Sequence, residues 1–180
     1  MQYFLIILSA LFMGLSQQPI GCGWFAWFSL IPLINYFNSN NSLKNKLYIS
    51  FLWGFIYHSS IIYWMVFNLG TTELLGFISL ILATLILSVN TLLIVFLYHI
   101  ISKTQFSKVY YFIPTIWVMV EYIRTFSIIG FPWVSLANSQ VYYNTLAQNV
   151  ELTGIYGISF WLVLINVILY DLYKNKDKNT

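Results

Sequence analysis

The residues of this sequence best placed to do chemistry lie between positions 121 and 140. Glu121 and Arg124 are three residues apart, so on a helix their side chains share one face and can pair. A Gly-Phe-Pro-Trp turn follows at 130–133, where Gly and Pro end the helix and the aromatic residues favour a membrane interface. The stretch then continues without charge to Asn149. We predict a lipid- or substrate-binding site formed by Glu121, Arg124, Gly130, Phe131, Pro132, Trp133 and Gln140.

The acid–base pair has two interpretations. A charge at the centre of a membrane helix costs about 2.5–3.5 kcal/mol on insertion scales, so an ionisable residue kept there is by default a functional hypothesis. The alternative is an interfacial ion pair that only stabilises the bundle. We favour function because Arg124 stands apart from every other basic residue of the chain, all of which are lysines in other segments.

Other polar residues in apolar runs are predicted to be structural. Asn90 and Asn166 lie mid-run and are expected to hydrogen-bond between helices. His58 has no second His, Asp or Glu nearby in its run, so we expect a hydrogen-bonded interior residue. Cys22 has no His within reach by sequence, and its default role is that of a small buried hydrophobe. No metal-ligand spacing, phosphate loop or nucleophile–base pair occurs, so we predict no catalytic residue, metal or cofactor.

Composition fixes the class of protein that positions these residues. Of 180 residues, 59% are hydrophobic and 7% are charged, whereas charged residues make up about 25% of an ordinary soluble domain. The net charge of +3 is too small and too scattered to indicate nucleic-acid binding. Long uncharged runs without strict alternation, such as 74–87, favour helices over a membrane barrel. We therefore predict an all-α, polytopic transmembrane helical bundle.

About six membrane spans are predicted, in a helical domain covering residues 1–173 that is followed by a tail at 174–180. The first two limbs have about 16 residues each, which is marginal for crossing a bilayer, so they can form a short hairpin. The predicted spans are 3–18, 22–37, 47–67, 74–101, 109–126 and 154–173.

The lysines predict the orientation of the bundle. With six spans, all seven lysines fall in the 38–46 loop, the 102–108 loop and the C-terminal tail, on the side that also holds the N-terminus. The excess of positive charge in cytoplasmic loops then places both termini in the cytoplasm. The 121–140 stretch is accordingly expected at the outer face of a bacterial plasma membrane.

Four motifs taken together resemble the membrane part of apolipoprotein N-acyltransferase, and they cover nearly the whole chain. The two later motifs are fairly specific, and the two earlier ones are loose. The motifs are Pro19-Ile20-Gly21 with Trp24–Trp27 and Ile31-Pro32-Leu33; Gly54-Phe55 with Tyr63-Trp64; Glu121–Arg124 with Gly130–Trp133 and Ser139-Gln140; and Gly154–Phe160 leading to Asn166.

The resemblance implies an integral inner-membrane enzyme. Members of this family transfer an acyl chain from a phospholipid to the free amine of a lipid-modified N-terminal cysteine on an apolipoprotein. The reaction passes through a thioester on a Cys, assisted by a Glu and a Lys, in an extracytoplasmic nitrilase-like domain. The expected partners are therefore membrane phospholipid and an apolipoprotein.

This sequence departs from the family pattern, because the 180 residues contain no nitrilase-like domain and Cys22 matches nothing in the catalytic motif. Nucleophilic catalysis needs an activated thiolate beside a base. We therefore expect this chain alone to be inactive, as a truncated product or as half of a split enzyme with a separately encoded nitrilase-like domain.

Two other functions stay open. The chain could anchor a glycosyltransferase-type partner that acts on polyprenyl phosphates, and the neighbouring genes would discriminate that case. It could also be a small transporter-like subunit. That function requires polar residues converging from several helices, and Asn90, Asn166 and His58 are sparse.

Overall fold

The computed structural model describes residues 1–70, 72–126 and 131–176, and every regular element among them is helical. Among these described residues, three segments are long and apolar enough to cross a membrane. They are α3 (Leu43–Ile62) with the 3₁₀ turn η2 (Tyr63–Phe67), α4 (Glu73–Ser102) and α7 (Val150–Lys176). The all-α prediction is confirmed, whereas the number of six spans and the side of the termini stay predictions.

The first two predicted spans are shorter than expected. Helix α1 (Gln2–Leu15) has 14 residues, which at 1.5 Å per residue is about 21 Å, against a hydrocarbon layer of about 30 Å. The 22–37 segment is not one helix but a 3₁₀ turn and a short α-helix, with a proline in the first turn of the latter. These elements are η1 (Gly23–Trp27) and α2 (Ile31–Phe37).

The predicted fifth span also divides, into η3 (Val109–Phe112) and α5 (Ile113–Thr125). Pro114 lies in the first turn of α5, where a proline breaks no hydrogen bond. The described part of the connection that follows, from residue 131 onward, contains η4 (Pro132–Val134), η5 (Leu136–Gln140) and α6 (Asn144–Ala147). Helix α7 begins four residues before the predicted boundary of 154, and Gly154 (φ 66°, ψ 177°) kinks it there.

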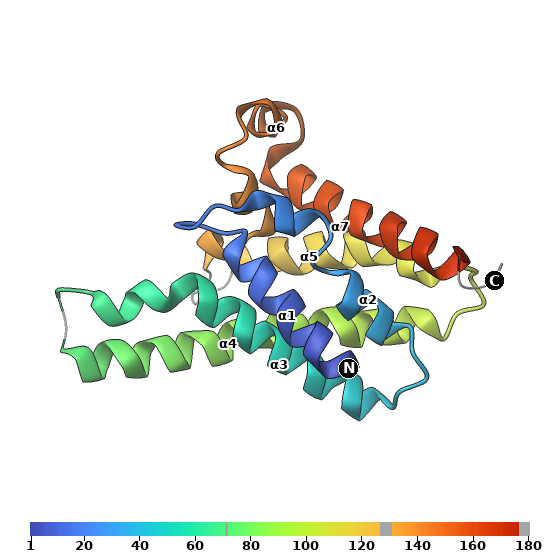
Figure 1. Ribbon diagram of the computed structural model, residues 1–180, viewed down its shortest axis with the longest axis horizontal. Helices are drawn as coiled ribbons and strands as arrows, with labels where there is room; N and C mark the ends of the chain where they lie inside the picture. The colour runs from blue at the N-terminus through green and yellow to red at the C-terminus, as the bar shows by residue number, and fades with distance from the viewer. Residues whose placement is uncertain (71, 127–130, 177–180) are drawn as a thin grey trace.

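The helices pack around a long antiparallel hairpin of α3 and α4 (Figure 1). Gly54 on α3 permits the close approach, because a Cβ at this position would lie 2.2 Å from Thr91 Oγ1 on α4. Helix α1 crosses α3, and α5 packs against both α4 and α7. The adjoining ends of η2 and α4 extend beyond the rest of the bundle at the left of the view.

One end of the bundle collects the lysine-bearing loops (Figure 1). There Tyr98 Oη donates to Asn38 Oδ1 at 2.6 Å, which joins the end of α4 to the end of α2. Asp171 on α7 forms a salt bridge with Lys108 at 2.8 Å and raises the pKa of that lysine by accepting its hydrogen bond. The first contact places the 38–42 loop beside the C-terminal end of α4, and the second places the 103–108 loop beside the C-terminal end of α7.

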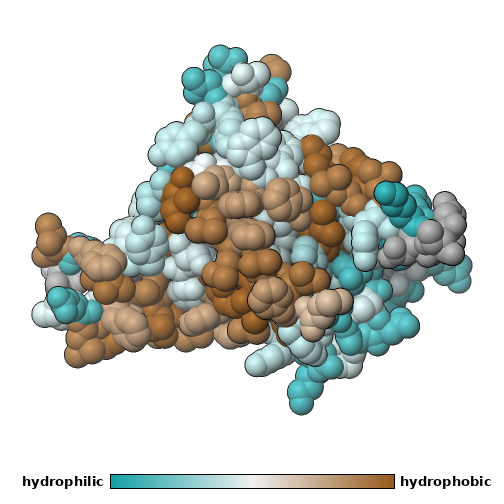
Figure 2. Space-filling view, viewed as in Figure 1, coloured by the Kyte–Doolittle hydropathy of each residue, from teal (hydrophilic) through white to brown (hydrophobic). Residues whose placement is uncertain are grey.

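The exterior is largely apolar where helices lie exposed (Figure 2). Leu74, Phe77 and Leu82 on α4 each expose more than half of their surface. Hydrophilic residues gather around α6 and at the lysine-bearing end. An apolar surface this extensive marks a membrane-facing protein.

We predict that Gly54→Ala destabilises the bundle. The added methyl group collides with Thr91, and such overpacking costs about 1–3 kcal/mol, which exceeds the gain in helix propensity of up to about 1 kcal/mol. The thermal unfolding midpoint in detergent should therefore fall. Gly70→Ala is the matched control, since the nearest neighbour to its added carbon is 3.5 Å away. A midpoint for Gly54→Ala at or above that of the wild type would contradict the prediction.

Candidate functional site

Glu121 lies buried near the end of α5, with 4% of its surface exposed. Its carboxylate accepts hydrogen bonds from Ser135 Oγ and from the backbone N–H of Leu136, each at 2.9 Å, and from Trp117 Nε1 at 3.3 Å. The first two donors belong to the segment that follows the 127–130 stretch. Glu121 therefore fastens this segment, residues 131–140, to the end of α5.

Ser135 is the meeting point of further buried polar side chains. Gln17, just beyond α1, donates from Nε2 to the Ser135 carbonyl at 3.3 Å and to Tyr57 Oη on α3 at 3.1 Å. Ser159 on α7 lies 3.1 Å from Ser135 Oγ and accepts from the Ala137 N–H at 3.1 Å. The 131–140 segment is thus tied directly to α5, to the end of α1 and to α7, and through Gln17 to α3.

Gln140, one of the predicted site residues, is a structural link in this arrangement. Its Nε2 donates to the Gly23 carbonyl at 3.0 Å and so joins η5 to η1. The two backbones are close, because a Cβ on Gly23 would lie 2.4 Å from the Ser139 carbonyl oxygen. Gln140 is itself 1% exposed, so it positions the segment and presents no surface of its own.

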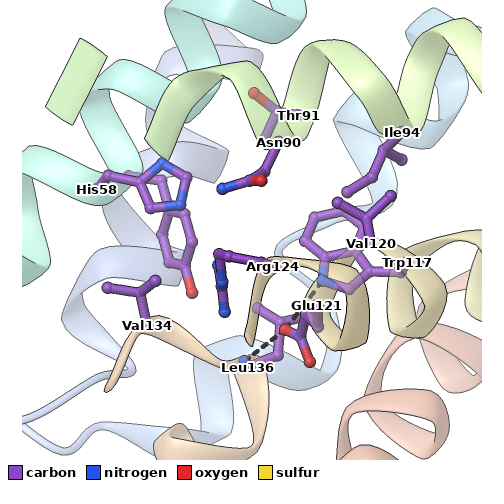
Figure 3. A pocket seen from close by; sticks show the side chains of 11 residues that line it. His58, Asn90, Thr91, Ile94, Trp117, Val120, Glu121, Arg124, Val134 and Leu136 are labelled. Atoms are coloured by element: carbon purple, nitrogen blue, oxygen red, sulfur yellow. Dashed lines mark hydrogen bonds between the residues drawn. The ribbon is translucent and has the colours of Figure 1, made fainter. Parts of the chain in front are cut away.

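The predicted ion pair between Glu121 and Arg124 is not formed. Within the described ranges the one salt bridge joins Lys108 and Asp171 at the far end of the bundle. The neutral donors of Ser135, Leu136 and Trp117 satisfy the Glu121 carboxylate in place of the guanidinium. The two side chains share a helix face as expected, but Arg124 points elsewhere (Figure 3).

Arg124 points into a small polar cavity between α3, α4, α5 and the 131–140 segment (Figure 3). The cavity measures about 20 Å³, which is room for one water molecule. The buried Nε of Arg124 makes no hydrogen bond with any residue that the structure describes. The wall is formed by Tyr57, His58, Asn90, Thr91, Ile94, Trp117, Val120, Glu121, Arg124, Val134 and Leu136.

His58 forms part of this wall without acting as a ligand. Its Nδ1 lies 2.7 Å from the Gly54 carbonyl, one helical turn earlier, and the side chain is 2% exposed. This contact confirms the prediction of a hydrogen-bonded interior histidine. Within residues 1–70, 72–126 and 131–176, no three His, Cys, Asp or Glu side chains converge as a metal site would require.

The aromatic residues of the predicted site form an exposed cluster. Trp133 exposes 64% of its surface and lies edge-on to Phe131, with ring centroids 5.4 Å apart, and to Trp64 of η2 at 6.5 Å. This cluster bridges the 131–140 segment and the α3–α4 hairpin. Gly130 lies outside the described residues, and Pro132 begins η4.

Two predictions about single polar residues have opposite outcomes. Asn166 is confirmed as a link between segments: Oδ1 accepts from the Leu30 N–H at 2.9 Å, and Nδ2 donates to the Ala26 carbonyl at 2.8 Å. It thereby holds the interrupted η1–α2 region against α7. The prediction for Cys22 is wrong, because this cysteine is exposed in the turn before η1, where the chain reverses at Gly21.

Sequence reasoning missed Gln17, Ser135 and Ser159 as site residues. Each is a small or neutral polar residue, and nothing local distinguishes it from other polar residues in apolar runs. One general rule could have pointed to them. Burying an unpaired polar group costs free energy, so a polar residue inside an apolar run must find a hydrogen-bond partner in another segment. That rule indicates that a partner exists but does not identify it.

Comparisons with known proteins cover most of the chain. A family model described as the apolipoprotein N-acyltransferase N-terminal domain matches residues 9–168. An apolipoprotein N-acyltransferase of Geobacter metallireducens is 28% identical over 175 residues, which is 96% of this chain and 33% of the relative. One from Pasteurella multocida is 25% identical over 174 residues, covering 94% of this chain and 32% of the relative. The chain thus spans about a third of the length of these curated relatives.

We predict that Glu121→Gln loosens the 131–140 segment. The amide loses the charge that strengthens the bonds from Ser135 and Leu136, and a hydrogen bond to a charged group contributes about 1.5–3 kcal/mol. Amide hydrogen exchange at Leu136 should therefore accelerate by about tenfold to a hundredfold.

Glu151→Gln is the matched control, because this carboxylate is exposed in the first turn of α7. Its exchange pattern in residues 131–140 should equal that of the wild type. Unchanged exchange at Leu136 in Glu121→Gln would show that the carboxylate does not fasten the segment.

Proposed function

This chain belongs to the apolipoprotein N-acyltransferase family, whose N-terminal domain it matches over residues 9–168, and from that membership we propose that it is the membrane domain of such an enzyme. The reaction transfers an acyl chain from a membrane phospholipid to the N-terminal lipidated cysteine of an apolipoprotein. The domain crosses the bacterial plasma membrane about six times, with both termini in the cytoplasm.

The observation that carries the proposal is the fastening of residues 131–140 by the buried Glu121. Burying a carboxylate inside a membrane bundle costs free energy. Here the carboxylate of Glu121 holds the uncharged, aromatic 131–140 segment against α5. The segment belongs to the stretch on which the family resemblance is most specific. A rigid platform at the membrane surface is what an enzyme needs in order to hold an acyl donor and an acceptor peptide in register.

The residues of this chain bind and position, and the acyl-transfer chemistry belongs to a nitrilase-like domain outside residues 1–180, carried by the same polypeptide or by a separate one. Two observations support this division. The relatives are about three times as long as the matched region. Within the described residues, the exposed sulfhydryl of Cys22 has no hydrogen-bonded base beside it, and a nucleophilic thiol requires one.

The site residues take separate roles in the proposed enzyme. Arg124, Phe131 and Trp133 contact the phospholipid at the level of its headgroup, where guanidinium and aromatic groups are favoured. Glu121 and Gln140 are positioning residues, because both are buried and bond to the backbone of other segments. For Gly130 and Pro132 the proposal keeps the role expected from the sequence, which is to shape the lipid entry together with the two aromatic residues.

The test is reconstitution of acyl transfer. The chain is co-expressed with the nitrilase-like domain encoded in the same genome, and mass spectrometry measures N-acylation of a diacylglyceryl-cysteine peptide in phospholipid vesicles. We expect acylation only when both parts are present. Arg124→Ala should lower the rate by about tenfold at equal abundance, the equivalent of one charged hydrogen bond.

Lys103→Ala is the matched control, because it removes a cation from the opposite end of the bundle. Its rate should equal that of the wild type. Acylation by the nitrilase-like domain without this chain would overturn the proposal, and an unchanged rate in Arg124→Ala would return Arg124 to a purely structural role.

A further inference from the structure

An apolar groove lies on the outer surface between α4 and α5. It has a volume of about 310 Å³. Val89 and Ile123 on its rims expose 54% and 51% of their surfaces, whereas Leu87 and Val120 form a buried floor. The lining residues are Ile86, Leu87, Val89, Asn90, Leu93, Val120, Ile123 and Arg124.

The groove shares a wall with the polar cavity described above. Asn90, Val120 and Arg124 line both spaces. Hydrocarbon side chains therefore dominate one space, while an amide, a guanidinium, an imidazole and a carboxylate surround the other (Figure 3). A ligand in the groove therefore meets apolar side chains along most of its length and the polar groups of Asn90 and Arg124 at the shared wall, which suits an amphiphile with an apolar tail and a polar end.

The wall that the groove and the cavity share lies at the membrane depth of a lipid headgroup, as the position of Arg124 indicates. Arg124 follows Lys108 by one 3₁₀ turn and most of α5, which places it roughly 26 Å further along the bundle at about 2.0 and 1.5 Å per residue. The hydrocarbon layer is about 30 Å thick. With the lysine-bearing loops at one membrane surface, Arg124 lies near the opposite boundary of that layer.

Charge decides which amphiphile fits. Glu121, the nearby anion, is engaged by Ser135, Leu136 and Trp117, while the Nε of Arg124 makes no hydrogen bond within the described part of the chain. A guanidinium matches the oxygens of a phosphate group geometrically and electrostatically. An anionic phosphate therefore complements this end of the groove better than a free hydroxyl does.

We propose that the groove between α4 and α5 holds one membrane phospholipid, with an acyl chain along Val89, Leu93 and Ile123 and its phosphate at Asn90 and Arg124. This lipid belongs to the leaflet opposite the lysine-bearing loops. The inference deepens the proposed function by naming where the lipid sits. Its test requires no acyl transfer, so the two proposals fail independently.

Photolabelling locates such a lipid. The protein is reconstituted in phosphatidylcholine vesicles that contain phosphatidylglycerol with a diazirine in its acyl chain, and the labelled peptides are mapped by mass spectrometry. We expect labelling concentrated on residues 86–93 and 120–124. Ile123→Trp fills the groove and should lower that labelling by about tenfold, as should Arg124→Gln, which removes the charged donor.

Leu169→Trp is the control, since it adds the same bulk to an exposed position on α7 outside the groove. Should Arg124→Gln not fold, Ile123→Trp at a half-exposed position keeps the test decisive. Labelling spread evenly over α4, α5 and α7, or unchanged in Ile123→Trp, would overturn the inference. Equal competition by phosphate-free diacylglycerol would also overturn it, because the phosphate would then not be recognised.

A donor and a resident lipid are distinguished in the reconstituted enzyme. Transfer of the labelled acyl chain to the acceptor peptide identifies the bound lipid as the donor. Retention of the lipid through turnover identifies it as a resident part of the membrane domain. Both outcomes support the site.

Discussion

A buried carboxylate in a membrane bundle needs hydrogen-bond donors, and this requirement organises the structure around the end of α5. Glu121 takes its donors from a segment that would otherwise be a loose connection, namely the hydroxyl of Ser135 and the N–H of Leu136. The segment in turn provides acceptors and donors to Gln17 and Ser159. Leaving the buried charge of Glu121 unsatisfied would be costly. The hydrogen bonds that satisfy it therefore hold the 131–140 segment, the end of α5 and the neighbouring helices α1 and α7 together.

The same requirement explains how the chain tolerates its breaks. Where α1 ends and the chain passes through η1 into α2, backbone groups lose their helical partners, and lipid offers no substitute. Asn166 supplies them from α7, by accepting from Leu30 and donating to Ala26. Five residues further along α7, Asp171 does the equivalent for the connection between α4 and α5 by binding Lys108 and Tyr110. Polar side chains on α7 thus brace both irregular regions.

Composition and the length of apolar runs were sufficient to predict a helical membrane protein, and they located α3, α4 and α7 well. They failed where tertiary contacts decide the local structure: 22–37 divides because Asn166 satisfies the interrupted backbone, and no nearby residue reveals this. Glu121 and Arg124 were found from their charge alone. Their partners were not, because helical spacing favours an ion pair, whereas the donors of Ser135 and Leu136 come from a segment that only the fold brings close.

Helix α4 is about 45 Å long at 1.5 Å per residue, whereas η3 and α5 together extend only about 27 Å beside it. A bilayer of uniform thickness cannot suit both, since burying all of α4 would require a lean steeper than membrane helices usually adopt. The surrounding lipid therefore meets a long apolar surface on the side of the α3–α4 hairpin and a much shorter one on the sides of α1 and α5. This hydrophobic mismatch would deform the membrane unevenly, with acyl chains stretched beside α4 and disordered beside its shorter neighbours.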